Sequence, residues 1–442
     1  MNWSDQFNIC AFLDTHHYQL PLKHYSAILA VGAVRLFKAE QDNYLDELKK
    51  WAVKDWMFGH FSYGYKTGPD SVHSSLPDRL GFPASFFFIP ETIFLLTENE
   101  LRIESCSAEP EELFESLNKF PFQREISRQS QLSMQKEEMQ GEEWLLHREL
   151  KNKGTMLNDV SRNQKLQFSP RLSKTEYIEK INTLKAHIAR GDCYEINFCQ
   201  EFYAENAEIN PITIYARLSE ISPTPFAAYY KIDDHFLICA SPERFLQKRG
   251  STICSQPIKG TWERNRHNEE ADMHNQYLLQ NDPKERAENV MIVDLVRNDL
   301  SKFCKEGTVK VKELCGVYPF PQVHQMISTI CGEVSDELHW TDAIKASFPM
   351  GSMTGAPKYR VTELIEQYEV THRGLYSGAI GYVSPVGDFD FNVVIRSLLY
   401  NQTEKYLSYQ VGSGITFYAD PEKEYEECLL KAEAIKRIFE PD

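Results

Sequence analysis

The sequence predicts an α+β fold, because its strand-like and helix-like stretches do not alternate in the regular strand–helix–strand order of a parallel sheet. Short apolar runs separated by turns fill the first hundred residues, for example at 25–31 and 86–89. Near the carboxyl end, strand-like runs at 377–383, 391–399 and 407–411 have the spacing of antiparallel hairpins. With 442 residues, 42% of them hydrophobic, the chain can bury a large core.

The chain is expected to contain two parts. Residues 1–170 form an N-terminal region that contributes strands and linking helices, and residues 171–442 form the core of the protein. The stretch from 101 to 170 is strongly polar, and we expect it to hold exposed helices that join two layers of the fold. No internal repeat and no low-complexity tract interrupts this organisation.

Three helices have clear start or stop signals. Ser173 and Glu176 match a capping box, and the helix that follows should end at Gly191, before a strand at 193–202. A second helix should start at Asp282-Pro283, since proline suits the first helical position. The last helix should run from Asp420-Pro421 to about residue 439.

Composition excludes several classes of protein. The formal charge of −16 argues against a nucleic-acid scaffold. The apolar runs are too short to span a bilayer, and the N-terminus has no basic region followed by an apolar one. The ten cysteines form no C-x-x-C pair, which favours free, reduced thiols in a cytoplasmic protein.

Lys259 is the first candidate catalytic residue. It lies in the stretch 257–261, Pro-Ile-Lys-Gly-Thr, where a proline and a glycine would hold its amine in a rigid bend. A lysine amine is a nucleophile only when it is neutral, which requires desolvation or a nearby cation. A solvated lysine in a surface turn is the simpler interpretation of these five residues alone.

Four further blocks accompany this bend in a fixed order, at 241–245, 286–300, 348–358 and 412–415. Together the five blocks resemble the chorismate-utilising enzymes, a family that includes component I of anthranilate synthase and of aminodeoxychorismate synthase. The resemblance is strong from about residue 171 to the end and weak over the first hundred residues. A lysine at position 259 resembles the aminodeoxychorismate branch, whereas the anthranilate branch usually carries alanine there.

The resemblance implies a sandwich of two antiparallel β-sheets flanked by helices, with the site between the sheets and Mg²⁺ as the cofactor. The pattern E-[YW]-x-E-x-x-x-K matches residues 424–431. It implies that Glu427 binds Mg²⁺ and that Lys431 contacts the substrate, while Glu288 is the second metal-binding glutamate. Taken alone, 422–427 would be a solvated acidic helix face.

The resemblance also implies a set of substrate-binding residues. Gly412, Ser413 and Gly414, following a strand, would cradle a carboxylate of chorismate, although an ordinary glycine turn would look the same. Arg396, expected in the middle of a strand, would bind the enolpyruvyl carboxylate beside Tyr382.

The remaining blocks complete the expected pocket. The segment 351–358 superficially matches a phosphate loop but lacks its Gly-Lys-Ser/Thr ending. The resemblance instead makes Ser352 and Thr354 polar contacts of the pocket. Glu243 would be the general acid for the departing 4-hydroxyl, a role that requires burial to raise its pKa; a surface carboxylate is the alternative.

Two positions depart from other branches of the family. Members that add water carry a lysine base where this chain has Glu195, which weakens an isochorismate synthase interpretation. The anthranilate branch has a histidine where this chain has Gln325, and the adjacent His324 should face the other way in a strand.

The resemblance therefore implies that the chain converts chorismate and ammonia to 4-amino-4-deoxychorismate, a precursor of p-aminobenzoate and folate. No glutaminase motif is recognisable, so the ammonia is expected to come from a separate glutamine amidotransferase subunit. The alternatives are anthranilate synthase component I, which Lys259 and Gln325 oppose, and a non-catalytic relative that senses chorismate or tryptophan. Loss of an acid or of a metal-binding carboxylate would mark that relative, and none is lost.

Overall fold

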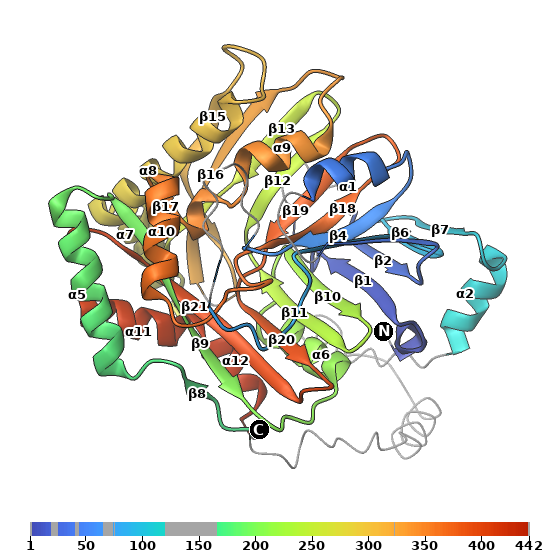
Figure 1. The fold of residues 1–442 in the computed structure, drawn as a ribbon, viewed down its shortest axis with the longest axis horizontal. Helices are drawn as coiled ribbons and strands as arrows, with labels where there is room; N and C mark the ends of the chain where they lie inside the picture. The colour runs from blue at the N-terminus through green and yellow to red at the C-terminus, as the bar shows by residue number, and fades with distance from the viewer. Residues whose placement is uncertain are drawn as a thin grey trace, which may run out of the picture.

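The computed structural model describes seven stretches of the chain: residues 2–18, 25–39, 44–64, 74, 76–119, 166–321 and 323–440. Two antiparallel sheets dominate the fold, as predicted (Figure 1). The first sheet has eleven strands in the order β17 (Gly355–Ala356), β9 (Glu195–Ala204), β21 (Tyr406–Ile415), β20 (Ser397–Asn401), β11 (His235–Ser241), β10 (Phe226–Ile232), β1 (Ile9–Asp14), β2 (Ala27–Val31), β6 (Thr92–Leu96) and β7 (Leu101–Ser105), with β8 (Ser169–Pro170) beside β9.

The second sheet has ten strands. Their order is β14 (Ile258–Glu263), β16 (Val323–Glu333), β13 (Thr252–Gln256), β12 (Arg244–Arg249), β19 (Phe389–Val393), β18 (Ala379–Val383), β4 (Met57–Phe61), β5 (Ser85–Ile89) and β3 (Arg35–Ala39), with β15 (Lys310–Pro319) beside β16. Strands from the first hundred residues lie in both sheets, so the N-terminal region forms part of the same sandwich as residues 171–440. The division at residue 170 remains a proposal.

Helices lie around this pair of sheets. The α-helices are α1 (Leu45–Trp51), α2 (Pro110–Lys119), α5 (Lys174–Arg190), α6 (Pro211–Ile221), α7 (Glu269–Asn281), α8 (Pro283–Ser301), α9 (Trp340–Ser347), α10 (Lys358–Tyr368), α11 (Pro421–Lys431) and α12 (Glu433–Ile438), and two short 3₁₀ helices are η1 (Asn2–Gln6) and η2 (Gly351–Met353). None of the helices in the described stretches is long and apolar enough to cross a membrane.

Two large hydrophobic cores hold the layers together. One contains aromatic side chains from both sheets, such as Tyr230 of the first sheet and Phe391 of the second. The other joins the first sheet to α5, α6, α10, α11 and α12. Burying apolar surface on both faces of the first sheet explains why its strands read as nearly continuous apolar runs.

The predicted helix ends agree with the structure. The Ser173 hydroxyl and the Glu176 carboxylate form a capping box at the start of α5, and Gly191 ends the helix with a φ of 88°. Asp282 caps α8 and Pro283 is its first residue. The Asp420 side chain likewise caps α11, but the predicted last helix is divided into α11 and α12 at Ala432.

Two strand predictions were wrong in their limits. The predicted strand 391–399 is divided between β19 and β20, and Arg396 lies in the break with a φ of 51° instead of in mid-strand. Gly412, Ser413 and Gly414 lie within β21 instead of after a strand, because β9 pairs with β21 as far as Ile415. The predicted polar helices of 120–165 lie outside the described residues, whereas α2 confirms a helix at the start of that stretch.

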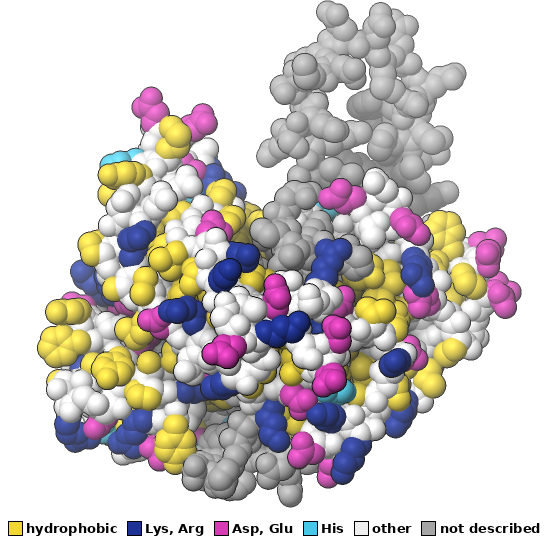
Figure 2. All heavy atoms as spheres, turned by 90° about the horizontal axis from the view of Figure 1, so that it is seen from above, with side chains coloured by type: hydrophobic (Ala, Val, Ile, Leu, Met, Phe, Trp, Pro, Cys, Tyr) yellow, Lys and Arg dark blue, Asp and Glu magenta, His cyan; other side chains and the backbone are white. Residues whose placement is uncertain are grey.

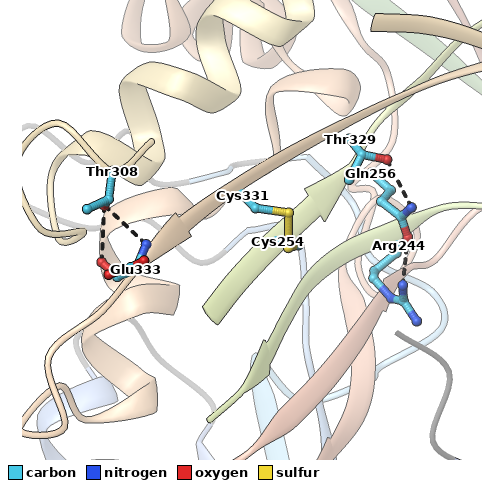
Figure 3. Close-up of a disulfide and its surroundings, with 7 residues drawn as sticks. All are labelled: Arg244, Cys254, Gln256, Thr308, Thr329, Cys331 and Glu333. Carbon is cyan, nitrogen blue, oxygen red and sulfur yellow. Dashed lines mark hydrogen bonds between the residues drawn. A yellow bond between two sulfur atoms is a disulfide. The ribbon is translucent and has the colours of Figure 1, made fainter. Parts of the chain in front are cut away.

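A disulfide between Cys254 and Cys331 corrects the prediction of ten free thiols (Figure 3). The two cysteines are direct partners in the antiparallel strands β13 and β16, with their Cα atoms 4.1 Å apart. They are 77 residues apart in the sequence, so no local spacing pattern could reveal the pair. The Arg244–Gln256–Thr329 chain of hydrogen bonds crosses the same strands nearby.

We expect this disulfide to stabilise the pairing of β13 with β16. In the chain-entropy description, closing a loop of this length stabilises the folded state by about 4 kcal/mol. Replacing both Cys254 and Cys331 by alanine should therefore lower the free energy of unfolding in urea by up to that amount, and a reductant should destabilise the wild type but not this variant. Cys106→Ala, at an exposed free thiol, is the control. Alkylation of ten cysteines in the unfolded, unreduced protein would contradict the bond.

Candidate active site

Lys259 lies in a bend at the edge of the second sheet. The pairing of β14 with β16 shifts register between Ile258 and Thr261, and Gly260 within this shift has a φ of 98°, which favours glycine. The bend directs the Lys259 amine toward the first sheet, where its Nζ lies 2.5 Å from Glu195 Oε1. The lysine side chain is 13% exposed and the glutamate side chain 1% exposed, so this ion pair joins the two sheets in the interior.

Carboxylates surround the Lys259 amine. Burial by itself would lower the lysine pKa, but the negative charges of Glu195 and Glu288 outweigh burial and raise the pKa above its ordinary value. Glu427 adds to the same effect. Without a bound cation, the nearby carboxylates therefore favour the ammonium form of Lys259, and burial alone does not supply the neutral amine that a nucleophile requires.

Glu243 lies at the crossing from the first sheet to the second, between β11 and β12. Its side chain is buried, and burial raises its pKa to about 7, although a hydrogen bond from the Ser352 side chain opposes that rise. Glu243 and Ser352 line the same pocket. A carboxyl group with a pKa near neutrality can hold a proton and release it during a reaction, as the predicted general acid requires.

Arg396, which is half-buried, and Gln325, which is buried, form a second pair between the sheets. With the Gln325 side-chain oxygen directed at Arg396, it accepts hydrogen bonds from Nη1 and Nη2 at 3.0 and 2.7 Å. Burial lowers the arginine pKa to about 10, and Glu243 opposes that change through its charge. The guanidinium thus remains a cation, and Gln325 holds it in place. His324 faces away, as predicted, with Nε2 3.0 Å from Asp272 Oδ1.

Glu288 and Glu427 approach this region from α8 and α11, and the charges of both act on Lys259. Burial raises the pKa of Glu288 to about 7. Its Oε1 atom is buried and has no hydrogen-bond partner in the described stretches. The positive charge of Lys431 lowers the pKa of Glu427, whose side chain is 44% exposed and lies 2.7 Å from the Lys431 amine.

These two glutamates fit a magnesium ion in their chemistry. Mg²⁺ prefers oxygen ligands and keeps several waters, so two carboxylates suffice when a substrate supplies further oxygens. Glu288 Oε1 has no hydrogen-bond partner in the described stretches and only a long ion-pair contact of 3.8 Å with the Lys284 amine, so it is the kind of atom that a metal cation would satisfy. In the described stretches, no group of three or more His, Cys, Asp or Glu side chains is arranged to hold a metal by itself.

The glycines of β21 allow the close approach of the charged groups. A Cβ atom on Gly414 would lie 2.5 Å from the Lys259 amine and 2.9 Å from Glu195 Oε1, so a side chain there would displace the ion pair. Beyond Tyr409, β21 no longer pairs with β20, but it pairs with β9 as far as Ile415. Lys431 donates a hydrogen bond to the Gly412 carbonyl at 3.0 Å, which fixes its amine beside this strand.

Two predicted contacts have different surroundings from those expected. The Thr354 hydroxyl lies 3.0 Å from the Met350 carbonyl within its own turn. Tyr382 lies in β18 against Tyr25 and Trp56, with ring centroids 6.3 and 5.8 Å away. It lines a separate pocket whose lining does not include Lys259, Glu243 or Arg396.

Sequence reasoning missed a network that links β21 to α8 and α11. The Ser413 hydroxyl donates a hydrogen bond to Glu424, and Lys284 lies 3.4 Å from Glu424 and 3.8 Å from Glu288. The spacing of Glu424 and Glu427 placed both on one helix face, but only the tertiary structure brings Lys284 of α8 to Glu424 of α11. Asn289, beside Glu288, donates to the Lys259 carbonyl at 3.2 Å.

The sequence matches the family of chorismate binding enzymes over residues 20–437, and the chain belongs to this family. A curated relative, aminodeoxychorismate synthase component 1 of Salmonella typhimurium, is 40% identical over 270 residues, which cover 61% of this chain and 58% of the relative. An anthranilate synthase component I-like protein of Synechocystis is 31% identical over 388 residues, covering 87% of this chain and 72% of that protein.

A solved structure supports the fold. Anthranilate synthase component I from Streptococcus pneumoniae matches with a TM-score of 0.72 and 26% identity, covering 95% of each chain. The predicted sandwich of two antiparallel sheets is thus confirmed. The chain spans 57–59% of the length of the bacterial aminodeoxychorismate synthase components that it matches at 36–40% identity.

Magnesium binding should depend on pH through Glu288. As the pH falls below about 7, a proton on Glu288 competes with the cation, so the apparent dissociation constant measured by titration calorimetry should rise. Glu288→Gln should weaken binding by roughly tenfold or more and remove most of this dependence. Asp294→Asn, at an exposed carboxylate on the same helix, should change neither. Equal affinity in Glu288→Gln and the wild type would contradict the assignment of this ligand.

Proposed function

We propose that this protein converts chorismate and ammonia to 4-amino-4-deoxychorismate, a precursor of p-aminobenzoate and folate. The observation that carries the proposal is the position of Lys259, a buried amine in contact with Glu195 and within the electrostatic reach of Glu243, Glu288 and Glu427. Several relatives with matching sequence are named aminodeoxychorismate synthase component 1, which favours this branch of the family.

The reaction uses the amine and the buried acid together. The Lys259 amine bonds to ring carbon C2 as the bond between C4 and its hydroxyl breaks, and Glu243 gives its proton to the departing oxygen so that water leaves. Ammonia then bonds to C4, the ring double bond returns and the lysine amine departs. A Glu243 pKa of about 7 suits this role, because the group is protonated in a useful fraction of molecules at neutral pH.

Cationic groups and the metal site would anchor the two carboxylates of chorismate. Arg396, held by Gln325, can bind one carboxylate through two parallel hydrogen bonds. Glu288 and Glu427 would hold Mg²⁺, which supplies positive charge for the other carboxylate when it is bound. Lys431 and the backbone of residues 412–414 border the same space, and Ser352 orients the acid.

The nitrogen donor and the location of the protein complete the proposal. The name component 1 of the relatives implies a second component in those proteins, and we propose a glutamine amidotransferase subunit as the source of ammonia here. We propose a cytoplasmic location, which the eight free cysteines favour and the Cys254–Cys331 disulfide opposes, since reduced thiols are typical of that compartment. On the face that Figure 2 shows, basic side chains are interspersed with acidic ones among the described residues, which does not favour a nucleic-acid partner.

The purified chain should turn over chorismate with ammonium salts and Mg²⁺, and glutamine should not replace ammonia. The product should keep its enolpyruvyl group, because Gln325 stands where the anthranilate branch has a histidine. Mass analysis of the product, followed by addition of a separate aminodeoxychorismate lyase, checks this outcome. Fluorescent anthranilate formed without the lyase would place the protein in the other branch.

Lys259→Ala should lower turnover with chorismate and ammonia by roughly 100-fold or more, the scale on which one positioned catalytic side chain contributes. A residual rate is expected, since ammonia can attack directly in an organised site. Intact-protein mass spectrometry with chorismate and Mg²⁺ but no ammonia should detect an adduct at Lys259 of the wild type. Lys248→Ala, at another lysine of the second sheet, should remain active. Full activity of Lys259→Ala would exclude the covalent route.

A further inference from the structure

Glu195 is the buried carboxylate that accepts a hydrogen bond from the Lys259 amine. We propose that Glu195 takes the proton of Lys259 when its amine bonds to carbon and returns the proton when the amine departs. The inference rests on the proposed function and adds to it a catalytic residue that contacts the reacting nitrogen. Members of the family that add water have a lysine at this position, so the role is particular to a chain with a carboxylate here.

The backbone holds Glu195 firmly in position. Glu195 opens β9, where β17 pairs with it through Ala356, and Tyr194 N donates to the Ala356 carbonyl at 2.7 Å. Gly355 approaches so closely that a Cβ atom on it would lie 2.1 Å from the Glu195 carbonyl oxygen. A carboxylate fixed in this way can exchange a proton with Lys259 without a change of conformation.

The second oxygen of Glu195 strengthens this assignment. Its Oε2 atom is buried and has no hydrogen-bond partner in the described stretches. A carboxylate that served only as a counter-ion would be better stabilised with both oxygens hydrogen-bonded, because a buried polar atom without a partner is costly. A carboxyl group that becomes neutral during the reaction cycle has less need of a second donor.

The proton balance is complete with the groups present. At rest, Lys259 is an ammonium group and Glu195 a carboxylate, so the pair shares one proton. That proton moves to Glu195 as the amine becomes neutral and bonds to C2, while Glu243 protonates the leaving hydroxyl. When ammonia displaces the lysine, the neutral amine recovers its proton from Glu195. The new C4 ammonium group of the product then gives a proton to Glu243, and the cycle is restored.

Other charged groups also face Lys259. Glu288 from α8, Glu427 and Lys431 from α11, and Glu243 from the β11–β12 crossing act on it through their charges. Glu195 differs from them because it accepts the hydrogen bond of the amine as well. The test must therefore separate transfer of the Lys259 proton from the titration of these neighbours.

The test compares the pH profiles of the wild type and Glu195→Gln. In the wild type the reactive form arises by internal transfer, without loss of a proton to solvent. In Glu195→Gln the solvent must take the proton, so the rate of adduct formation should depend more steeply on pH. We expect the ratio of the variant rate to the wild-type rate to rise about tenfold for each pH unit across neutral pH. Titration of Glu243 is common to both proteins and cancels in this ratio. Burial and the charge of Glu195 together raise the pKa of Glu288 to about 7, so the ratio is read above that pH, where Glu288 is ionised in both proteins.

Two further variants separate proton transfer from a structural role. Glu195→Asp keeps a carboxyl group, so its profile should run parallel to that of the wild type at a lower rate. Glu201→Gln removes a buried carboxylate of the same strand that pairs with Arg171, and it should leave the profile unchanged. Thermal melting of each variant checks that it folds. Glu195→Asp keeps the inference testable even if Glu195→Gln does not fold, because a profile steeper than that of the wild type would overturn it.

A readout without chorismate tests the ion pair independently. The pKa of Lys259, measured by competitive acetylation with acetic anhydride, should fall by about one unit or more in Glu195→Gln. An unchanged pKa, or a rate ratio that does not vary with pH, overturns the inference. Wild type that forms no adduct, together with a fully active Lys259→Ala, refutes the covalent route and the inference with it. A normal adduct in the wild type with parallel pH profiles refutes the inference alone.

Discussion

The ion pair between Lys259 and Glu195 is the interaction on which the rest of the site depends. Lys259 comes from the edge strand of the second sheet and Glu195 from the first sheet, so their contact sets the relative position of the two sheets at this end. A buried ammonium group without a partner would be strongly destabilising. The bend at Gly260 directs the lysine toward Glu195, and the absence of a side chain at Gly414 leaves room for the two groups to meet.

The same constraint organises the other charged groups. Three charged groups of the site have an opposite charge or a fixed dipole from another element: Arg396 has Gln325, Glu243 has Ser352, and Glu424 has Lys284 and Ser413. Together these contacts tie β16, β21, η2, α8 and α11 around one space. Three carboxylates, those of Glu195, Glu288 and Glu427, act on Lys259 through their charges, so under the proposed function a cation would offset the negative charge that an anionic substrate adds to this space.

Burial and nearby charges also shift the pKa values of the ionisable groups in this site in different ways. Glu243 and Glu288 both have a pKa of about 7, because burial disfavours their charged forms. The Lys259 pKa moves the other way, because nearby carboxylates favour the ammonium form more than burial opposes it. A proton donor and a protonated amine therefore lie within one site at neutral pH, and chemistry there requires a group that can accept the proton of the amine.

The sequence by itself determined much of this protein. Local signals placed the capped start of α5, the prolines that open α8 and α11, and the ordered motifs around Lys259, Glu243, Glu288 and Glu427, because helix caps and motif spacings depend on neighbouring residues. Contacts between distant segments were decided only by the tertiary structure. Cys254 and Cys331, Gln325 and Arg396, and Lys259 and Glu195 meet through strand register and the packing of the two sheets. The placement of Tyr382 in a separate pocket and the break that sets Arg396 outside a strand have the same origin. A local sequence pattern cannot show which strands pair with each other, because strand pairing depends on burying the apolar faces of both sheets at once.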